Sequence, residues 1–386
     1  MASLLNKLRM LDAEPKKPIV KPPAEKNTTQ YYHSQALFPL SLFTDRSHAR
    51  QDVLKSIFGC DFPERVYPED ILFLDTETTG LSGGVGTIAF QIGVGYFTAN
   101  GFVVEQYLMH DYPEEPEMLR ALDGLMQRFS ILCTFNGHTF DAPLLKTRFL
   151  MNRIANPHFP EIHADVLYPA RRLWKLRLKS CTLGHLEEQL LHVQREDDLP
   201  GALVPQTYFQ YLKDGNFDPL VKILEHNKQD IVSLAQLFYF MCKQFDMPDE
   251  ICEGEDLFSL ARAMEKQGRM DKAMHCYRLS ADSGMLSEAY QAMARIEKRE
   301  GNASAAIKLY QGMLSNGKDS VIACEALAKL YEHQLKDIPG AISYSRQALL
   351  LLSEPSLFYD ATVQERQKAL QYRYARLRRK LSAQSK

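Results

Sequence analysis

Two acidic residues separated by one threonine end the apolar run Ile71–Leu74, and they constrain this chain more than any other feature. Asp75 and Glu77 stand at positions i and i+2. On an extended strand, side chains two residues apart point to the same face. Two adjacent carboxylates fit poorly into a hydrophobic core, but their oxygens suit a hard divalent cation such as Mg²⁺. The pattern therefore predicts a metal site at the C-terminal end of a strand.

Two further aspartates in later motifs complete the predicted site. Asp141 follows the hexapeptide FNGHTF, and Asp230 follows HNKQ. Phosphodiester cleavage requires an activated water, neutralised phosphoryl oxygens and a stabilised leaving alkoxide, and two Mg²⁺ or Mn²⁺ ions can supply all three. Four carboxylates offset the repulsion between two such ions. The predicted ligands are Asp75, which we expect to bridge both ions, together with Glu77, Asp141 and Asp230.

Length and composition indicate an ordinary globular protein with two domains. A chain of 386 residues exceeds what one hydrophobic core usually supports. The hydrophobic share of 45% and the charged share of 24% are usual for a soluble protein. The formal net charge is only −2, so any nucleic-acid binding requires a local basic patch.

The cysteines and the apolar segments bear on the cellular compartment. The seven cysteines are scattered and form no CxxC pair, which favours reduced thiols over disulfides or structural zinc. The start of the chain lacks a signal-like apolar core. The longest apolar stretch, residues 231–242, contains Ser233 and Gln236 and is too short to span a bilayer. We therefore expect a soluble, cytoplasmic protein with no membrane partner.

The chain is predicted to consist of a leader and two domains. Residues 1–35 are expected to be a flexible leader, because residues 10–35 are rich in Pro, Lys, Asn and Thr. Residues 36–250 combine antiparallel strands with later strands that alternate with helices, which is typical of a mixed sheet with helices on both faces. Expected strands cover residues 71–75, 87–97, 102–108, 131–135 and 162–166, and expected helices cover residues 114–129, 142–150 and 220–245.

Residues 251–386 are predicted to be helical and repetitive. A small residue, a glycine, a small residue and an aromatic recur after 33 positions, as Ala261, Gly268, Ala273 and Tyr277 and then as Ala294, Gly301, Ala306 and Tyr310. A third copy is looser, with Asp337 near the expected glycine. The pattern resembles tetratricopeptide repeats, which implies a protein-binding module. An unrelated bundle of helical hairpins is the alternative. The basic residues 360–383 are expected to form a terminal helix that caps the stack.

The flanks of the acidic residues resemble the DEDD exonuclease superfamily, and in particular its YprB-type branch. The resemblance covers about residues 60–245 and rests on five segments: FLDTETTGLSGGVGT, TFNGHTFDAPLLKTRF, HADVLYPARRLWKLRLKSCTLGHLE, DDLPGALVPQTYFQYL and EHNKQDIVSLAQL. It implies an α/β ribonuclease-H-like mixed sheet with flanking helices. It also implies 3′–5′ hydrolysis of nucleic acid by a two-metal mechanism.

His226 stands four residues before Asp230. Members of the superfamily pair the last aspartate with a tyrosine four residues earlier or a histidine five residues earlier, and that residue orients or deprotonates the attacking water. Residues i and i+4 share a helix face, and a neutral imidazole can act as a general base near pH 7. Because a histidine in the tyrosine position matches neither pattern, a catalytic role and a supporting polar role stay open.

A basic segment surrounds the only tryptophan of the chain. Residues 171–179 contain five cations, among them Arg171, Arg172 and Lys175. One interpretation is phosphate binding by these cations with base stacking on Trp174. The other is a solvated helix face with Trp174 in the core.

Three residues near the predicted ligands have two interpretations each. Asp165 is either a fifth acid near the site or a cap for the segment that follows it. Asn136 and Gly137 either shape the turn that presents Asp141 or form an ordinary turn.

The sequence thus predicts a metal-dependent 3′–5′ exonuclease for single-stranded RNA or DNA, joined to a repeat module that binds a protein partner. One alternative is a scaffold that binds nucleic acid without cutting it, and another is an endonuclease. The complete set of four acids favours an enzyme over the scaffold. No residue type distinguishes an RNA from a DNA substrate.

Overall fold

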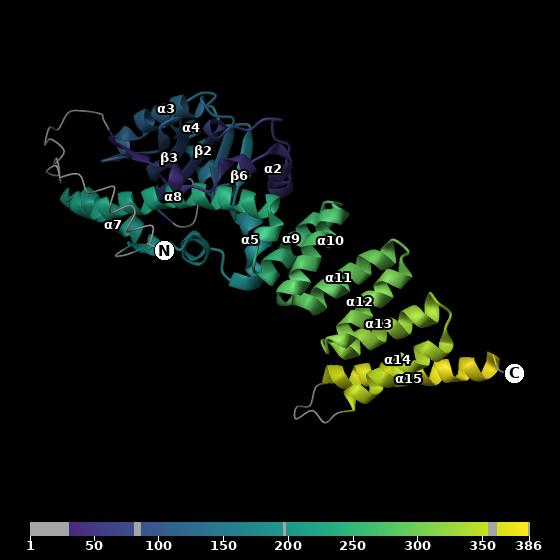
Figure 1. Cartoon of the computed structure of the whole chain (residues 1–386). Coiled ribbons are helices and arrows are strands. Elements are labelled where there is room, and N and C mark those ends of the chain that lie inside the picture. The colour runs from purple at the N-terminus through teal and green to yellow at the C-terminus, as the bar shows by residue number, and fades with distance from the viewer. Residues whose placement is uncertain (1–30, 81–85, 196–197, 354–360, 385–386) are drawn as a thin grey trace. The chain divides into compact units, whose positions relative to one another are not determined.

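The computed structural model describes residues 31–80, 86–195, 198–353 and 361–384 (Figure 1). The chain divides into two compact units, with the division between Met247 and Pro248. Most of the predicted leader, residues 1–30, lies outside the described residues.

The first unit is built on a six-stranded mixed sheet. Its strands are β1 (Tyr32–Phe38), β2 (Ile71–Thr78), β3 (Ala89–Thr98), β4 (Gly101–Leu108), β5 (Ile131–Thr134) and β6 (Ile162–Asp165). Their order in the sheet is β1-β4-β3-β2-β5-β6. The first four strands in this order pair antiparallel, and β5 and β6 join in parallel. This topology confirms the predicted mixed sheet.

Strand β1 corrects the predicted boundary of the leader. It pairs antiparallel with β4, from Tyr32 opposite Leu108 to Phe38 opposite Phe102. Its residues alternate between half-buried and exposed, as expected for an edge strand with one face toward solvent. Residues 32–35 therefore belong to the sheet. Their polar composition, which suggested a leader, is compatible with an edge strand because only every second side chain packs inward.

Helices cover both faces of this sheet. Figure 1 shows α3 (Glu115–Met126) and α4 (Asp141–Met151) on one side and α8 (Asp218–Asp246) on the other. Two glycines of β3 allow α8 to lie directly on the sheet. A Cβ atom at Gly93 would stand 2.0 Å from Oδ1 of Asn227, and one at Gly95 would stand 2.5 Å from a methyl group of Ile231. The position of α8 therefore depends on the absence of side chains at these two residues.

The remaining elements of the first unit are short. The other helices are α2 (Gln51–Phe58), α5 (Leu167–Leu178), α6 (Leu183–Leu186) and α7 (Val204–Asp214). Single turns of 3₁₀ helix cover Leu40–Leu42, Arg46–His48, Pro68–Asp70, Tyr112–Glu114 and Gly201–Leu203, and a π-helical turn covers Glu187–Leu191.

The second unit is helical throughout its described residues. After a 3₁₀ turn (Pro248–Glu250) come α9 (Gly254–Lys266), α10 (Met270–Ser280), a π-helical turn (Ala281–Met285), α11 (Leu286–Arg299), α12 (Ala303–Ser315), α13 (Ser320–His333), α14 (Ile338–Leu352) and α15 (Ala361–Gln384). A residue with a left-handed backbone connects the helices of each of three pairs: Gly268 (φ 76°), Gly301 (φ 83°) and Lys336 (φ 58°). The predicted helical fold is confirmed, whereas the tetratricopeptide assignment stays a prediction.

Helix α15 packs on the end of this unit through a buried glutamate. Glu332 of α13 accepts hydrogen bonds from Arg373, Arg376 and Lys380 of α15 at 2.7–3.0 Å. Burial raises the pKa of Glu332, but the hydrogen bonds from Arg376 and Lys380 outweigh burial and lower the pKa to about 2. The basic terminal helix is thus held by charge pairing at its inner face.

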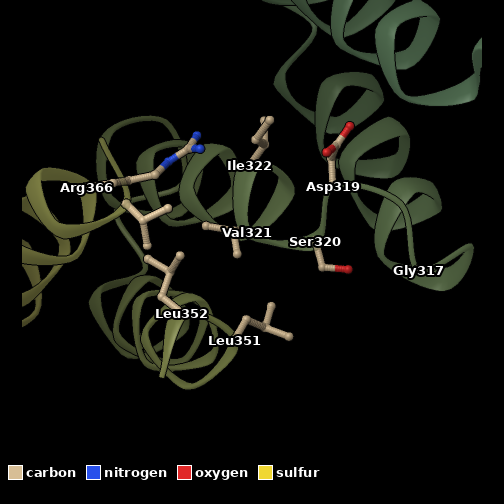
Figure 2. Close-up of a pocket in the computed structure, with 9 residues that line it drawn as sticks. Gly317, Asp319, Ser320, Val321, Ile322, Leu351, Leu352 and Arg366 are labelled. Atoms are coloured by element: carbon tan, nitrogen blue, oxygen red, sulfur yellow. The ribbon is translucent and has the colours of Figure 1, made fainter. Parts of the chain in front are cut away.

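A pocket opens in the second unit between α13, α14 and α15 (Figure 2). It is lined by Gly317, Asp319, Ser320, Val321, Ile322, Leu351, Leu352, Val363 and Arg366. None of the predicted ligands lines it.

Among the described residues of the chain, no helix combines the length and the hydropathy that a membrane span requires.

Candidate active site

Strand β2 ends in the two carboxylates that open the predicted site. Asp75 stands opposite Gly93 and Glu77 stands opposite Gln91 in the pairing with β3. A register shift after Glu77 interrupts the ladder. Because the side chain of Asn227 on α8 fills the space above Gly93, the face that carries Asp75 and Glu77 is the face that α8 covers.

Asp75 is held by a chain of buried amides. Asn227 is fully buried and donates from Nδ2 to Oδ2 of Asp75 at 2.9 Å. Gln106 of β4 donates to Oδ1 of Asn227 at 3.1 Å and to the carbonyl of Leu224 at 2.7 Å. Burial, followed by the negative charges of the other three predicted ligands, raises the pKa of Asp75 well above its usual value. Asn227 was not recognised from the sequence, where its only signal is a polar residue on an otherwise apolar helix face.

Asp141 is the first residue of α4. Its Oδ1 accepts a hydrogen bond of 2.5 Å from the hydroxyl of Thr76, the residue between the two acids of β2. Burial raises the pKa of Asp141 to about 6, although the bond from Thr76 opposes this rise. The preceding turn depends on Asn136, which has a left-handed backbone (φ 68°), and on Gly137, where a Cβ atom would stand 2.4 Å from Oγ1 of Thr134. Both residues therefore have the turn-shaping role.

Asp165 fixes the turn that leads to Asp141. It is 3% exposed, and its carboxylate accepts the backbone N–H groups of Asn136, His138 and Leu167 at 2.8–3.1 Å. The structure supports the capping role. It also places Asp165 close enough to the site for its charge to raise the pKa of Asp141. The bond of Asp165 to Leu167 holds the start of α5, and its other bonds hold the turn before α4.

The end of β2 and the middle of α8 bring three ligand-type side chains together. One potential ligand atom from each of Glu77, His226 and Asp230 lies within 4.8 Å of the other two. Nε2 of His226 is 3.5 Å from Oδ2 of Asp230 and 3.8 Å from Oε1 of Glu77. The i, i+4 spacing on α8 thus places His226 and Asp230 on one face. Asp75 and Asp141 lie outside this group of three, so the structure does not display Asp75 at the centre of the site.

Arg195 and Asp198 border this group and were not recognised as site residues from the sequence. Arg195 donates to both oxygens of Glu187, at 2.5 and 2.7 Å, and also to Oδ1 of Asp230. Asp198 accepts from Arg195 at 3.2 Å, and its Oδ1 lies 2.8 Å from Nδ1 of His226. Their sequence signal is the run of one arginine and three acids at residues 195–198.

Neighbouring acids raise the pKa of both carboxylates at the end of β2. Burial raises the pKa of Glu77, the charge of His226 lowers it, and the charges of Asp230 and Asp141 raise it further, with a resulting pKa of about 8. The hydrogen-bond partners of Asp75 and Asp141, Asn227 and Thr76, carry no charge. Buried carboxylates are normally paired with a cation or bind a metal ion. Asp75 and Asp141 therefore have no cationic hydrogen-bond partner among the described residues, whereas Arg195 lies at Asp230 and His226 lies beside Glu77.

Residues at the site fit a divalent cation. The donor set is rich in carboxylate oxygen, which hard cations prefer. Gln91, opposite Glu77 in the sheet, is fully buried, and neither of its side-chain amide atoms has a hydrogen-bond partner among the described residues. An unpaired buried amide beside under-compensated acids is consistent with a site completed by an ion and its water.

The basic segment on α5 places its tryptophan in the core and two of its cations at the surface. Trp174 is fully buried and stacks on Phe240 at 6.1 Å between ring centroids, so the interpretation of Trp174 as a base-stacking platform is wrong. Arg172 donates to the carbonyl of Ile57 at 2.8 Å. Arg171 and Lys175 are exposed. The burial of Trp174 follows from helical spacing, because Leu173 and Trp174 form the inner face of α5.

Comparison with known proteins defines the class of the first unit. A profile of the RNase_H superfamily matches residues 72–242, which span the sheet from β2 to β6 and most of α8. The first unit is therefore a ribonuclease-H-like domain, which confirms the fold that the resemblance of its motifs implies. Membership of this superfamily indicates a nuclease-type activity on nucleic acid. Domains of the superfamily generally use divalent metal ions for this chemistry.

The chain is also similar to a protein of known sequence over most of its length. It is 30% identical over 322 residues to "Uncharacterized protein YprB" of Bacillus subtilis (strain 168). The match covers 81% of this chain and 76% of YprB. The chain belongs to the YprB family.

Among solved structures, the family B DNA polymerase from the hyperthermophilic archaeon Pyrobaculum calidifontis matches 52% of this chain. The sequence identity is 13%, the TM-score is 0.36, and the match spans 29% of the polymerase chain. At this TM-score the likeness carries no argument about the fold or the function.

Proposed function

We propose that this chain is a DEDD-type 3′–5′ exonuclease that hydrolyses single-stranded RNA or DNA with Mg²⁺ or Mn²⁺. The observation that carries the proposal is the gathering of four acids from three distant segments at the end of β2. There the charges of Asp230 and Asp141 raise the pKa of both Asp75 and Glu77. The four acids are Asp75, Glu77, Asp141 and Asp230.

In this proposal the acids hold two metal ions, which supply charge neutralisation at the phosphate and activation of water when bound. Glu77 and Asp230 are close enough to share one ion. Asp75, from the same strand face as Glu77, and Asp141, held by Thr76, complete the ligand set. Because ligands must be deprotonated, ion binding displaces the proton that Glu77, with its pKa of about 8, retains near neutral pH.

His226 is the proposed acceptor for the proton of the attacking water. Its Nε2 atom faces Glu77 and Asp230, so a water held at these carboxylates lies within reach of the imidazole. The side chain is 15% exposed, which leaves it accessible from the site. The positively charged Arg171, Arg172 and Lys175 on α5 are the proposed phosphate contacts for the nucleic-acid strand.

The second unit is proposed to bind a protein partner. Its stacked helical hairpins provide a large surface for its length, which is how helical repeat proteins recognise partners. A cytoplasmic location also stays a prediction, supported by the scattered cysteines of the sequence.

Digestion of end-labelled substrates tests the proposed activity. The purified full chain is incubated with 5′-labelled single-stranded RNA, single-stranded DNA and duplexes, with Mg²⁺, with Mn²⁺ or with chelator. We expect a ladder of 5′-labelled products that shorten from the 3′ end, only with metal and chiefly from one single-stranded substrate. A 3′-blocked strand and a circular strand should resist, whereas an endonuclease would cut both.

Two site variants and one surface variant control this experiment. Asp75→Ala and Asp230→Asn should lose cleavage while their circular dichroism spectra match that of the wild type. Asp61→Asn removes a carboxylate whose side chain is 87% exposed and should leave cleavage unchanged. Equal cleavage by Asp75→Ala and wild type would exclude the proposed site. Binding of the strands without metal-dependent cleavage would instead support a nucleic-acid scaffold.

A further inference from the structure

The Nδ1 atom of His226 contacts two groups that require opposite protonation states of that atom. Its Nδ1 atom lies 2.8 and 3.0 Å from the two oxygens of Asp198, and 3.1 Å from Nη1 of Arg195. A carboxylate only accepts hydrogen bonds, and a guanidinium only donates them. Nδ1 must therefore carry the proton if Asp198 is its partner, and must carry a lone pair if Arg195 is its partner.

The geometry favours Asp198 as the partner. The contact to Asp198 is shorter, and both carboxylate oxygens lie within hydrogen-bond distance of Nδ1. Arg195 does not need Nδ1, because its Nη1 group also donates to Oδ2 of Asp198 at 3.2 Å. Nε2 faces the carboxylates of Glu77 and Asp230, so it keeps a lone pair only when a bound ion occupies those oxygens. A general base needs that lone pair.

A buried ion pair holds Asp198 in this position. Glu187 is 1% exposed and binds Arg195 through two hydrogen bonds of 2.5 and 2.7 Å. Such a two-bond pair fixes the plane of the guanidinium. The same guanidinium donates to Asp198 and to Asp230. Glu187 and Arg195 thus connect the loop that carries Asp198 to the helix that carries His226 and Asp230.

We propose that Asp198 is a positioning residue that accepts the Nδ1 proton of His226 and thereby aims the Nε2 lone pair into the Glu77–Asp230 cluster. The role rests on the proposed hydrolytic function, in which His226 accepts a proton from water. Asp198 acts through His226 and touches neither the substrate nor the reacting water. The arrangement parallels other enzymes in which a carboxylate fixes the tautomer of a catalytic histidine.

Nitrogen-15 NMR of the full chain with saturating Mg²⁺ tests the tautomer without any need for activity. Histidines are labelled with nitrogen-15, and His226→Gln identifies the signals of His226 among the eleven histidines. For the neutral ring of the wild type we expect a protonated Nδ1 and an unprotonated Nε2. A proton on Nε2 in the wild-type protein would overturn the proposal, and this measurement depends on no variant of Asp198.

Asp198→Asn should reverse the tautomer. Arg195 can only donate, so it retains the carbonyl oxygen of the new amide and leaves the NH₂ group facing Nδ1. We expect the proton to move to Nε2 and the cleavage rate to fall by about 10²–10⁴-fold, with little change in substrate binding. An unchanged tautomer together with cleavage at the wild-type rate would overturn the positioning role.

Asp249→Asn is the matched control. Asp249 also contacts a histidine, His275, at 3.0 Å, but it is exposed and lies in the second unit. Its variant should leave both the His226 signals and cleavage unchanged. The results separate failure of the proposed function from failure of the role of Asp198. A wild-type protein that carries the proton on Nδ1 but never cleaves overturns the proposed function. A wild-type protein that cleaves with the proton on Nε2 overturns only the role of Asp198.

Discussion

Glu77 in the first unit and Glu332 in the second are two partly or fully buried glutamates with opposite surroundings. Glu332 is enclosed by Arg373, Arg376 and Lys380, and its pKa is lowered to about 2. Glu77 lies near three other acids, and its pKa is raised to about 8. Burial acts in the same direction on both residues, so the neighbouring charges decide the difference.

The comparison teaches that burial alone does not mark a functional acid. Glu332 receives its positive charge from the chain itself and holds α15 in place. Among the described residues, the first unit concentrates acids at one point and places Arg195 at Asp230 and His226 beside Glu77, but no cation at Asp75 or Asp141. A site whose charge balance is left incomplete by the chain is suited to a metal ion, at a cost in the stability of the metal-free fold.

Exchange of each glutamate for glutamine should give the largest and clearest separation between the two regions. Glu77→Gln removes a proposed ligand. Loss of a residue that only hydrogen-bonds to a metal ligand typically lowers metal affinity or activity by about 10–100-fold, so we expect cleavage to fall at least about a hundredfold. Its metal-free form should unfold at a higher temperature, because a repelled carboxylate is gone. Glu332→Gln should keep cleavage and lose about 1–3 kcal/mol of unfolding free energy. Differential scanning fluorimetry and the digestion assay measure both. Wild-type cleavage by Glu77→Gln, or loss of cleavage by Glu332→Gln, would contradict the roles assigned to the two glutamates.

The metal-free protein should lose stability as the pH rises. A carboxyl whose pKa is raised by folding binds protons more tightly in the folded state, so its contribution is complete below the unfolded pKa and is lost as the pH rises through the folded pKa. For Glu77 this window runs from 4.5 to about 8, and for Asp141 it runs from 3.8 to about 6. We expect the unfolding free energy of the metal-free chain to fall by about 2–4 kcal/mol between about pH 5 and about pH 8.5.

Chemical denaturation at a series of pH values measures this fall. Glu77→Gln should flatten the slope in the upper part of the window. Saturating Mn²⁺ should restore stability at high pH, because the ion binds the deprotonated carboxylates of the folded state only. A metal-free protein whose stability is constant over this range would show that the acids are compensated in some other way.

Gly93→Ala should damage the site through packing. The new Cβ atom would stand 2.0 Å from Oδ1 of Asn227, so α8 or the amide that holds Asp75 must move. We expect a loss of about 1–3 kcal/mol in unfolding free energy and a reduced affinity for Mn²⁺. Gly124→Ala on α3 is the matched control: a Cβ there meets nothing within 4 Å, and its variant should be as stable as the wild type or up to about 1 kcal/mol more stable. A Gly93→Ala protein with unchanged metal affinity would show that Asn227 does not position Asp75.

The smallest effect is expected from the basic residues of α5. Arg171→Ala and Lys175→Ala remove exposed cations and should weaken nucleic-acid binding without any change in stability. If each neutralises one phosphate, the dependence of log K on log salt concentration should become less steep by about 1 per residue. Fluorescence anisotropy across a salt series measures this slope. An unchanged slope in the double variant would place the strand elsewhere on the molecule.

Local patterns in the sequence were sufficient to predict five of the six described strands and two of the side-chain pairings at the site. Asp75 and Glu77 share a face because strand side chains alternate, and His226 and Asp230 share a face because a helix repeats every 3.6 residues. The buried runs predicted β2, β3, β4, β5 and β6 to within a few residues. The edge strand β1 was missed because one exposed face makes its composition resemble that of a leader.

The contacts that organise the site could not be predicted, since they join segments far apart along the chain. Asn227 reaches Asp75 across 152 positions, and Arg195 reaches Asp230 across 35 positions from a loop without regular structure. No periodic pattern marks such residues. Asp165 shows the same difficulty: the sequence left its two roles open, and only the folded chain shows that it accepts three backbone N–H groups and also acts on the pKa of Asp141.

The sequence is sufficient to identify the acids of the site. It also predicts that Asp75 and Glu77 share a face of one strand, that His226 and Asp230 share a face of one helix, and that a helical region follows. The tertiary structure alone decided that the acids converge, that neutral amides and a hydroxyl hold Asp75 and Asp141, and that Trp174 belongs to the core. The reason is physical: alternation and helical repeat are properties of the local backbone, whereas the charge balance of a buried carboxylate is set by whatever the folded chain places around it.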